Sequence, residues 1–295
     1  MSLLGVLDRI ADKPTFDRAI EPARAAVQAL LRPQALKDLL HGTWLGHPLH
    51  PVLAQVPVGS WVSAGILDAI PPARPAAALL IGTGVAAAVP TALSGAADWS
   101  EQEIGVRRLG AVHAVANTVA LGLYVGSLVA RARGAGALGR VLAYSGLGLA
   151  GGSAAIGGHM SYAQSSGASH SATAARGLTH EWIDLGPMDD LPDHRPALRT
   201  GEGQGAPVPL AVVRRGTRVD VFVGTCSHLG GPLPEGTVEQ VRGADCLVCP
   251  WHGSAFELDE GQPRRGPAAT VQEKLEVRYV AGRVEARLSG RHLEG

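Results

Sequence analysis

The order of apolar and charged residues divides the chain into two halves. Four stretches contain no Asp, Glu, Lys or Arg: Val52–Leu67, Ala76–Ala97, Leu109–Ala130 and Val141–Met160. A helix needs about 20 apolar residues to cross a bilayer, with a usual range of roughly 17–25. The last three stretches meet this requirement, and the first does so if it extends to Ile70 with Asp68 at the interface. The pattern predicts a four-helix transmembrane bundle in residues 41–160.

Four buried helices of a large soluble enzyme are the alternative interpretation of these stretches. Helices on the surface of a soluble protein usually show a polar stripe, and these stretches show none. Gly122 and Gly126, like Gly148 and Gly152, have the spacing of small residues that lets helix backbones approach closely in lipid. This spacing favours the membrane interpretation.

Residues 1–40 precede the bundle and carry an amphipathic pattern. From Pro22 onward, Ala23, Val27 and Leu30 share one helical face, and proline is well tolerated at the first position of a helix. We expect a helix that begins at Pro22. It either lies in the membrane interface or docks on the bundle or on the soluble domain, and the sequence leaves these options open.

The pattern changes after Met160. Residues 161–179 are rich in Ser, Ala and Gly, which predicts a flexible linker. From Glu181, short apolar runs separated by glycines predict an all-β domain in residues 180–295. The expected strands are Pro209–Val213, Val219–Val223, Leu247–Val248, Ala255–Leu258, Leu275–Val280 and Val284–Leu288, the last two forming a hairpin.

Charge and cysteine content limit the range of possible functions. The formal net charge is +0, so no basic field suggests nucleic acid as a partner. The three cysteines, Cys226, Cys246 and Cys249, lie within 24 residues, and an odd, clustered set is a better ligand set than a disulfide framework. The N-terminus has neither a basic region nor an apolar run typical of a secretory signal.

The strongest chemical signal is the pair Cys226-Ser-His228 and Cys249-Pro-Trp-His252. Each segment offers one thiolate and one imidazole, as a [2Fe–2S] cluster with two cysteines on one iron and two histidines on the other requires. A structural zinc site has the same inventory, but its patterns usually pair Cys with Cys and His with His. The alternation here favours the iron–sulfur cluster.

Residues 180–290 resemble the Rieske domain family through CSHLGGPL, CPWHGSAF and the final hairpin. The resemblance implies one-electron transfer by a cluster bound to Cys226, His228, Cys249 and His252. Ser254 matches a hydroxyl that hydrogen-bonds a cluster sulfur in respiratory members. Those members also carry a disulfide where this chain has Gly231 and Trp251, and commonly a tyrosine where it has Phe256. Fewer hydrogen bonds to sulfur predict a potential in the low part of the Rieske range.

Histidines mark the membrane half, where ionisable residues are functional candidates. With four spans, all four histidines fall near the side that carries the cluster domain: His47, His50, His113 and His159. They either bind haem b or another metal, or they cap helices and bond to backbone. Residues 40–165 also resemble a family of four-span bacterial membrane domains of unassigned function, some of them fused to Rieske domains, through GHPLHP, His113 and Gly-Gly-His159.

These expectations combine into a multi-pass protein of the bacterial inner membrane whose cluster lies on the cytoplasmic side. It would carry single electrons between a redox donor and an acceptor, either proteins or a quinone, without a substrate site of its own. The alternatives are a redox-sensing or assembly module, and a component of a Rieske-type oxygenase system. An oxygenase would need a separate iron held by two histidines and a carboxylate, and no large domain is present to house it.

Overall fold

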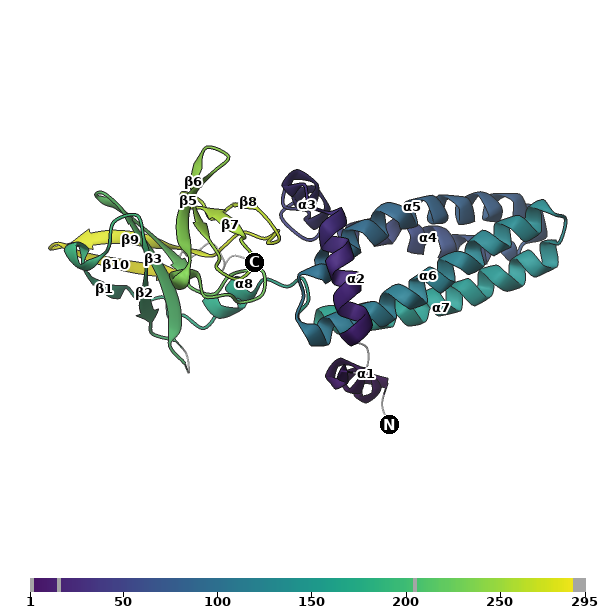
Figure 1. Ribbon diagram of the computed structural model, residues 1–295, viewed down its shortest axis with the longest axis horizontal. Helices are drawn as coiled ribbons and strands as arrows, with labels where there is room; N and C mark the ends of the chain where they lie inside the picture. The colour runs from purple at the N-terminus through teal and green to yellow at the C-terminus, as the bar shows by residue number, and fades with distance from the viewer. Residues whose placement is uncertain (1–2, 15–16, 204–205, 289–295) are drawn as a thin grey trace. The chain divides into compact units, whose positions relative to one another are not determined.

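The computed structural model describes residues 3–14, 17–203 and 206–288. The chain divides into two compact units. The first unit, helical throughout, consists of Met1–Leu36 and Pro48–Ser166; the second consists of Lys37–His47 and Gly167–Gly295 and carries the strands (Figure 1). A short piece of the N-terminal region, Lys37–His47, is therefore part of the second unit.

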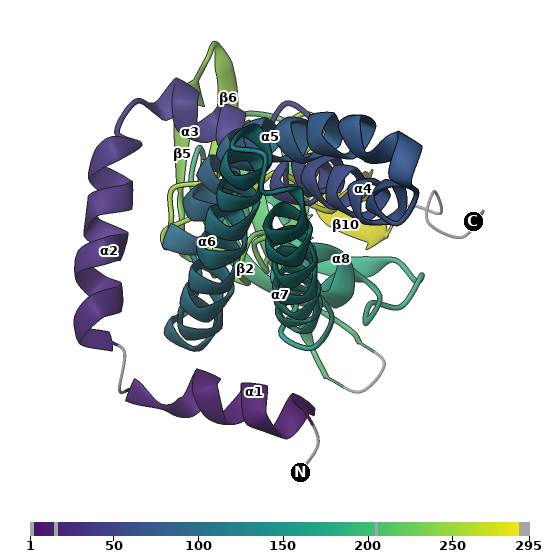
Figure 2. The same cartoon turned by 90° about the vertical axis from the view of Figure 1, so that its right-hand side faces the viewer.

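Four long helices form the core of the first unit (Figure 2). They are α4 (His50–Asp68), α5 (Arg74–Ser100), α6 (Ile104–Ala132) and α7 (Gly136–Tyr162), with the short 3-10 helix η2 (Pro71–Ala73) before α5. Prolines in the first turn start α4 and α5, where a missing N–H costs no hydrogen bond. Gly134, at a φ of 82°, allows the chain to turn sharply between α6 and α7.

Large apolar side chains cover the outside of these four helices. The exposed residues include Val52, Val56, Val62, Ile66, Leu79, Val89, Val115, Val119, Leu138 and Val141. Soluble proteins rarely expose so much contiguous apolar surface. Three helices are long and apolar enough to cross a membrane, namely Pro71–Ser100, Ile104–Ala132 and Gly136–Tyr162. The expected count of four spans is not confirmed, because among the described helices α4, with 19 residues, is not one of these three.

Three helices precede the bundle: α1 (Leu3–Asp12), α2 (Asp17–Leu30) and α3 (Gln34–His41). The expectation that a helix begins at Pro22 is wrong, because Pro22 lies inside α2. Near the start of a helix a proline removes only one backbone hydrogen bond, so α2 continues through it. Arg108 of α6 donates two hydrogen bonds of 2.7 Å to Asp17. Of the options left open, docking on the bundle is the one observed for α2.

The second unit contains two antiparallel sheets. The larger has the strand order β1-β10-β9-β4-β3-β2 and the smaller β5-β6-β7-β8. Their bounds are β1 (Ile183–Pro187), β2 (Pro196–Gly201), β3 (Val208–Arg215), β4 (Arg218–Val223), β5 (Thr237–Val241), β6 (Ala244–Val248), β7 (Ala255–Glu257), β8 (Pro263–Arg265), β9 (Lys274–Val280) and β10 (Arg283–Leu288), with the 3-10 helices η3 (Met188–Asp190) and η4 (Leu233–Glu235) between them.

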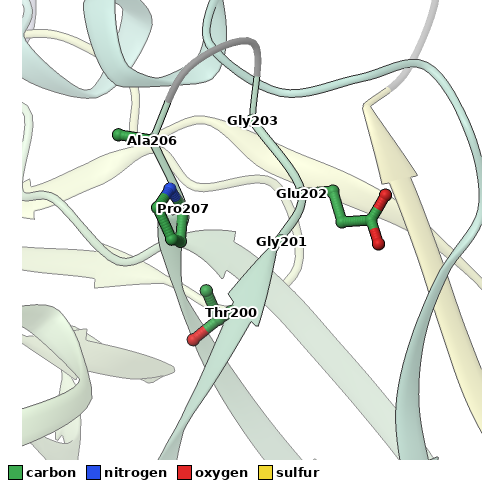
Figure 3. A pocket seen from close by; sticks show the side chains of 6 residues that line it. All are labelled: Thr200, Gly201, Glu202, Gly203, Ala206 and Pro207. Atoms are coloured by element: carbon green, nitrogen blue, oxygen red, sulfur yellow. The ribbon is translucent and has the colours of Figure 1, made fainter.

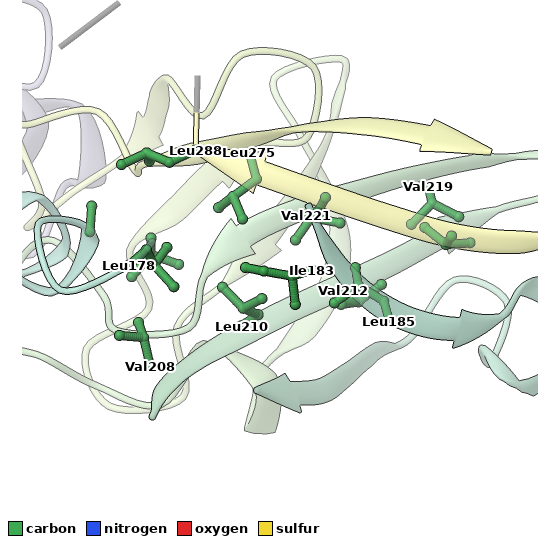
Figure 4. Packing of buried hydrophobic residues seen from close by; sticks show 14 of the residues in the cluster. Leu178, Ile183, Leu185, Val208, Leu210, Val212, Val219, Val221, Leu275 and Leu288 are labelled. Carbon is green, nitrogen blue, oxygen red and sulfur yellow. The ribbon is translucent and has the colours of Figure 1, made fainter. Parts of the chain in front are cut away.

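Alternating side chains of the larger sheet build one hydrophobic core (Figure 4). Leu210, Val221 and Val284 are fully buried there. The predicted hairpin is present: β9 and β10 pair from Leu275 opposite Leu288 to Val280 opposite Arg283. Its turn places Ala281 and Gly282 at φ values of 49° and 78°, the positive values that a two-residue hairpin turn requires.

The expected linker is only partly a linker. Within residues 161–179, α7 continues to Tyr162 and a further helix, α8 (His170–Ala175), begins after an N-cap at Ser169. Ala175 is buried in the core of the larger sheet. The serine and alanine residues that predicted a flexible linker therefore also form a small helix, because alanine has a high helix propensity and serine caps the first turn.

A buried ion pair joins α4 to α6 and yields a first prediction. Arg131 donates to both carboxylate oxygens of Asp68, with a distance of 2.9 Å from Nη1 to Oδ1, and Asp68 is 2% exposed. In Asp68→Ala, Arg131 would keep its charge without a partner. We expect a loss of about 3–5 kcal/mol in stability, measured from the unfolding midpoint of the helical signal in detergent.

The matched control removes the exposed pair between Glu21 and Arg107, whose Glu21 side chain is 50% exposed. We expect Glu21→Ala to cost less than about 1 kcal/mol. Equal losses for the two variants would contradict the assignment of Asp68 as a buried structural charge.

Candidate metal centre

Two loops of the second unit carry the predicted ligands, and their backbones fold alike. Each loop closes with a hydrogen bond from the cysteine N–H to the carbonyl five residues on, from Cys226 to Gly231 and from Cys249 to Ser254, both 2.8 Å. Each also has a glycine at the fourth residue after its cysteine, Gly230 at a φ of 76° and Gly253 at 71°. The two loops are thus near-copies of one turn, one following β4 and the other β6.

Backbone N–H groups converge on both sulfurs. The N–H groups of His228 and Leu229 hydrogen-bond the sulfur of Cys226, and those of Trp251 and His252 hydrogen-bond the sulfur of Cys249. A hydrogen bond from Cys226 lowers the pKa of Cys249 to about 6, while the same contact and burial raise the pKa of Cys226. Such donors stabilise negative charge on sulfur, as a metal-bound thiolate requires.

The two imidazoles lie side by side between the loops. The ring centres of His228 and His252 are 5.1 Å apart. Burial lowers the pKa of His228 to about 3, and the charges of His252, His41 and His170 add to this shift, so its ring is neutral, as a metal ligand must be. Nδ1 of His228 is buried with no hydrogen-bond partner in the described part of the chain. A buried nitrogen without a partner is costly, and a metal would satisfy it.

This donor set fits a two-iron cluster better than a single ion. The thiols of Cys226 and Cys249 contact each other, and the rings of His228 and His252 lie 5.1 Å apart, so the four side chains form one cysteine pair and one histidine pair. In a Rieske centre each iron takes two protein ligands. The four residues Cys226, His228, Cys249 and His252 can therefore hold such a cluster.

The two loops touch at the positions that match the respiratory disulfide. A Cβ on Gly231 would lie 2.7 Å from Sγ of Cys249 and 3.2 Å from the ring of Trp251. The absence of a side chain at Gly231 thus allows the first loop to approach the second. The structure has Cys226, Cys246 and Cys249 as free thiols.

Gln272 fixes the first loop and is a residue that the sequence did not reveal. Its side chain is fully buried. Its amide oxygen accepts the N–H of Ser227 (2.9 Å). The two protons of its amide nitrogen are shared among three oxygens, the carbonyls of Val223 and Thr225 (2.7 and 3.0 Å) and the hydroxyl of Ser171 in α8 (2.7 Å). No motif marks this glutamine, because its partners are mainly backbone groups.

Three further residues near the loops, Ser254, Phe256 and Cys246, are all buried. The hydroxyl oxygen of Ser254 accepts the N–H of Ala268 at 3.0 Å, which leaves its own proton for another acceptor. Phe256 is fully buried in the core between the sheets and offers no hydroxyl. Cys246 packs in a separate apolar cluster, and burial raises its pKa to about 11.

The segment Lys37–His47 contributes a second unexpected contact. Asp38 is 5% exposed, accepts the N–H of Gly266 at 2.8 Å and pairs with Arg242 at 2.5 Å. His41 beside it is buried. Because Arg242 lies in the β5–β6 turn and Gly266 follows β8, this segment joins two separate turns of the smaller sheet. No sequence pattern predicts this contact, because residues 1–40 are expected to form an N-terminal helical segment and residues 41–160 the membrane bundle.

The structure brings together only two of the four membrane histidines in the described chain. The ring centres of His50 and His113 are 6.4 Å apart. His159 is buried near the end of α7, and His47 belongs to the other unit. His113 accepts a hydrogen bond from the Asn117 amide at Nε2, with a nitrogen–nitrogen distance of 3.0 Å. The interpretation of these histidines as ligands of haem b is not supported.

A hollow at the β2–β3 connection lies apart from the cluster loops (Figure 3). The described residues that line it are Thr200, Gly201, Glu202, Gly203, Ala206 and Pro207. Glu202 is the charged group in this lining, and its carboxylate points away from Thr200 and Pro207 in Figure 3. None of the predicted site residues lies in this hollow.

Two families match the chain in succession. The Rieske [2Fe–2S] domain matches residues 181–276, and a family described as predicted membrane protein (DUF2231) matches residues 46–178. These matches confirm the fusion that the two sequence resemblances indicated. The Rieske match implies a [2Fe–2S] cluster, and together with the three apolar helices the second match indicates a multi-pass membrane protein.

The similar proteins align with the cluster domain. The ferredoxin CarAc of Metapseudomonas resinovorans is 36% identical over 76 residues, 26% of this chain and 67% of that protein. A Rieske domain-containing protein of Homo sapiens is 46% identical over 37 residues, 12% of this chain and 24% of that protein. A solved complex of reduced oxygenase and oxidized ferredoxin in carbazole 1,9a-dioxygenase is 29% identical, with 37% of this chain and 94% of that chain covered and a TM-score of 0.32.

The contact between the loops leads to a prediction about Gly231. In Gly231→Ala the new methyl group would lie 2.7 Å from Sγ of Cys249, so one loop must move away from the other. We expect the cluster content per chain to fall at least several-fold, measured as iron per protein and as the integrated signal in low-temperature EPR.

Gly282→Asn is the control, because asparagine tolerates the φ of 78° and no atom lies within 4 Å of a Cβ at this position. It should bind the cluster as the unmodified protein does. Full cluster content in Gly231→Ala would show that the loops do not need this approach.

Proposed function

Since this chain belongs to the Rieske [2Fe–2S] domain family through residues 181–276, and joins that domain to a predicted membrane protein domain (DUF2231), we propose that it is a membrane-anchored one-electron carrier. The observation that carries the proposal is the convergence of two thiols and two imidazoles on two matching loops. The cluster, when bound, supplies reversible storage of one electron. The residues of the chain hold it, shield it and present it to a partner.

In this proposal the four ligands are Cys226 and Cys249 on one iron and His228 and His252 on the other. The N–H donors at the sulfurs stabilise the thiolates, and the neutral imidazole rings reduce the negative charge at the cluster. His252 lies next to Trp251, whose side chain is 54% exposed. This edge gives a soluble partner a short path to the cluster.

The membrane anchor comprises four spans, with α4 as the first. Val52, Val56 and Ile66 of α4 expose apolar side chains, and the buried Asp68 is neutralised by Arg131. With four spans, residues 1–36 and the cluster domain leave the membrane on the same side. We place that side in the cytoplasm, because no disulfide joins the three cysteines and disulfides are rare in reducing compartments.

An oxygenase system is the second candidate for the protein's context. CarAc is named as a ferredoxin and the solved complex pairs a ferredoxin with a carbazole dioxygenase. We propose accordingly that the partners are a reductase and a terminal oxidoreductase that meet the cluster at the membrane surface. A redox sensor is the remaining alternative, and rapid turnover of the cluster between such partners would favour the carrier.

Ligand substitutions test the proposed site. Cys226→Ser and His252→Ala each remove one ligand, so we expect the Rieske EPR signal of dithionite-reduced membranes to be lost. Cys246→Ala is the matched control, because Cys246 is equally buried but lies in another cluster of side chains, and its signal should be unchanged. A signal that persists without Cys226, or that disappears without Cys246, would overturn the ligand assignment.

The environment of the sulfurs also predicts the potential. With Phe256 in place of a hydroxyl donor, the midpoint should lie in the low part of the range of about −150 to +300 mV. Phe256→Tyr should raise it and Ser254→Ala should lower it. A hydrogen bond of about 0.5–1.5 kcal/mol corresponds to roughly 20–65 mV in a one-electron couple.

Redox titration followed by EPR measures these shifts, with Cys246→Ala as the unshifted reference. A midpoint above about +150 mV in the unmodified protein, inside the Rieske span, would contradict this account of the sulfur environment.

A further inference from the structure

The hairpin α4–α5 is repeated in the chain as the hairpin α6–α7. Positions in α4 correspond to positions in α6 whose numbers are higher by 63, as for Trp61 and Tyr124, which stack with their ring centres 4.2 Å apart. The correspondence extends to burial. The buried residues Pro57, Trp61 and Ala64 of α4 match the buried residues Ala120, Tyr124 and Ser127 of α6.

The second helices of the two hairpins correspond in the same way, with a difference of 62. Five buried residues of α5 match five buried residues of α7: Ala77 with Gly139, Ile81 with Ala143, Gly84 with Gly146, Thr91 with Ser153 and Ala97 with His159. Two unrelated hairpins would not share so many buried positions at the nearly constant offsets of 63 and 62 residues. The helical unit is therefore a duplicated hairpin.

A pseudo-two-fold axis relates the two copies and passes between three pairs of facing side chains. These pairs are His50 with His113, Trp61 with Tyr124, and Asp68 with Arg131. In each pair the residue numbers differ by 63, so each residue faces its own counterpart in the other copy. A ligand on this axis would meet both copies equally.

The histidine pair has stayed identical in both copies, together with its surroundings. Nδ1 of His50 lies 2.9 Å from the carbonyl oxygen of Thr91, and Nδ1 of His113 lies 2.9 Å from that of Ser153. A Cβ on Gly95 would lie 2.7 Å from His50, and one on Gly157 would lie 3.3 Å from His113. The other two facing pairs have diverged, to Trp and Tyr and to Asp and Arg.

We propose that His50 and His113 together bind one transition-metal ion, of the class that imidazole ligands suit such as Zn²⁺, on the pseudo-two-fold axis of the helical unit. This site is separate from the [2Fe–2S] centre. It draws on neither His47 nor His159, and it leaves the proposed electron-carrier function unaffected if it fails.

The geometry of the two rings supports an ion. A histidine ligand usually donates one ring N–H to a carbonyl and binds the metal through the other nitrogen. Both histidines place Nδ1 on a carbonyl of their own hairpin, which leaves Nε2 for the ion. Two bonds of about 2.0–2.1 Å to the Nε2 atoms at a tetrahedral angle would hold the ring centres about 5 Å apart, so the rings, now 6.4 Å apart, would close by about 1 Å when the ion binds.

Access and the remaining donor are consistent with this site. Both imidazoles are half-buried, and His50 is the first residue of α4, so an ion can reach them from the end of the bundle. The amide nitrogen of Asn117 now lies 3.0 Å from Nε2 of His113. The ion would take the place of this hydrogen bond at Nε2, and the carbonyl oxygen of the Asn117 side chain would turn to it as the third protein ligand.

The experiment uses the purified full-length protein in detergent, equilibrated with Zn²⁺ against a chromophoric chelator. Zinc and iron are counted by elemental analysis, and EPR of the reduced cluster is recorded on the same samples. We expect about one zinc per chain, and at least a tenfold loss of affinity in His50→Ala and in His113→Ala. The double variant should lose no more than either single variant, because one ion needs both rings. His47→Ala is the control and should bind as the unmodified protein does.

Several outcomes would overturn the site. Equal zinc affinity in the unmodified protein and in the double variant would show that the histidines are not ligands. If the double variant lost the sum of the two single losses in binding free energy, the two histidines would not share one ion. A Soret band lost in both single variants would reassign the pair to haem. His50→Gln and His113→Gln, read by the same assay, replace the alanine variants if those fail to fold. The EPR signal of the cluster distinguishes all these outcomes from failure of the proposed function.

Discussion

The buried side chain of Gln272 is the contact on which the geometry of the cluster domain depends most. It joins the end of β4, the first ligand loop and α8, because its oxygen accepts the N–H of Ser227 and its two amide protons are shared among three oxygens. A buried amide with every donor and acceptor satisfied is rigid, because breaking one bond leaves an unpaired group in a medium of low dielectric constant. Since His228 lies one residue from Ser227, the orientation of one predicted iron ligand follows from this network. The second loop has its own anchors, in which Ala268 donates to Ser254 and Arg265 to the Gly253 carbonyl.

The sequence predicted the parts of the fold that rest on periodicity. The long apolar stretches lie in helices. Five of the six expected strands lie within β3, β4, β6, β9 and β10, and the sixth, Ala255–Leu258, extends one residue beyond the end of β7. The strands that escaped prediction have no continuous apolar run, as β8 with its two arginines shows. They form because a neighbouring strand offers hydrogen bonds, and a single sequence does not contain that information. For the same reason α8 was expected to be part of a linker, although its contact with Gln272 orders it.

In the candidate site, too, local features could be predicted and long-range contacts could not. Ligand types and spacing are local properties, so the two loops could be recognised from Cys226 and His228 and from Cys249 and His252 alone. Residues that act through long-range contacts could not be recognised. Asp38 lies more than two hundred residues from Gly266 and Arg242, and nothing near it in the sequence marks an acceptor for a turn of the β domain. For the four membrane histidines the sequence predicted too much. Their expected location on one side of the membrane indicated a single group, but among them only His50 and His113 have their rings close together.

Both proposed sites are built from two near-copies of one local element that face each other. The ligand loops share the same hydrogen bonds and the same glycine positions, and the two hairpins share buried positions at offsets of 63 and 62 residues. Facing copies bring like side chains to a common centre, which suits a ligand that needs the same donor from both sides. In the loops that ligand has two irons, and the copies differ in the spacing from cysteine to histidine. In the hairpins the histidine pair alone has kept both its side chain and its glycine support, and for this reason we place the ion there rather than at the aromatic or the charged pair.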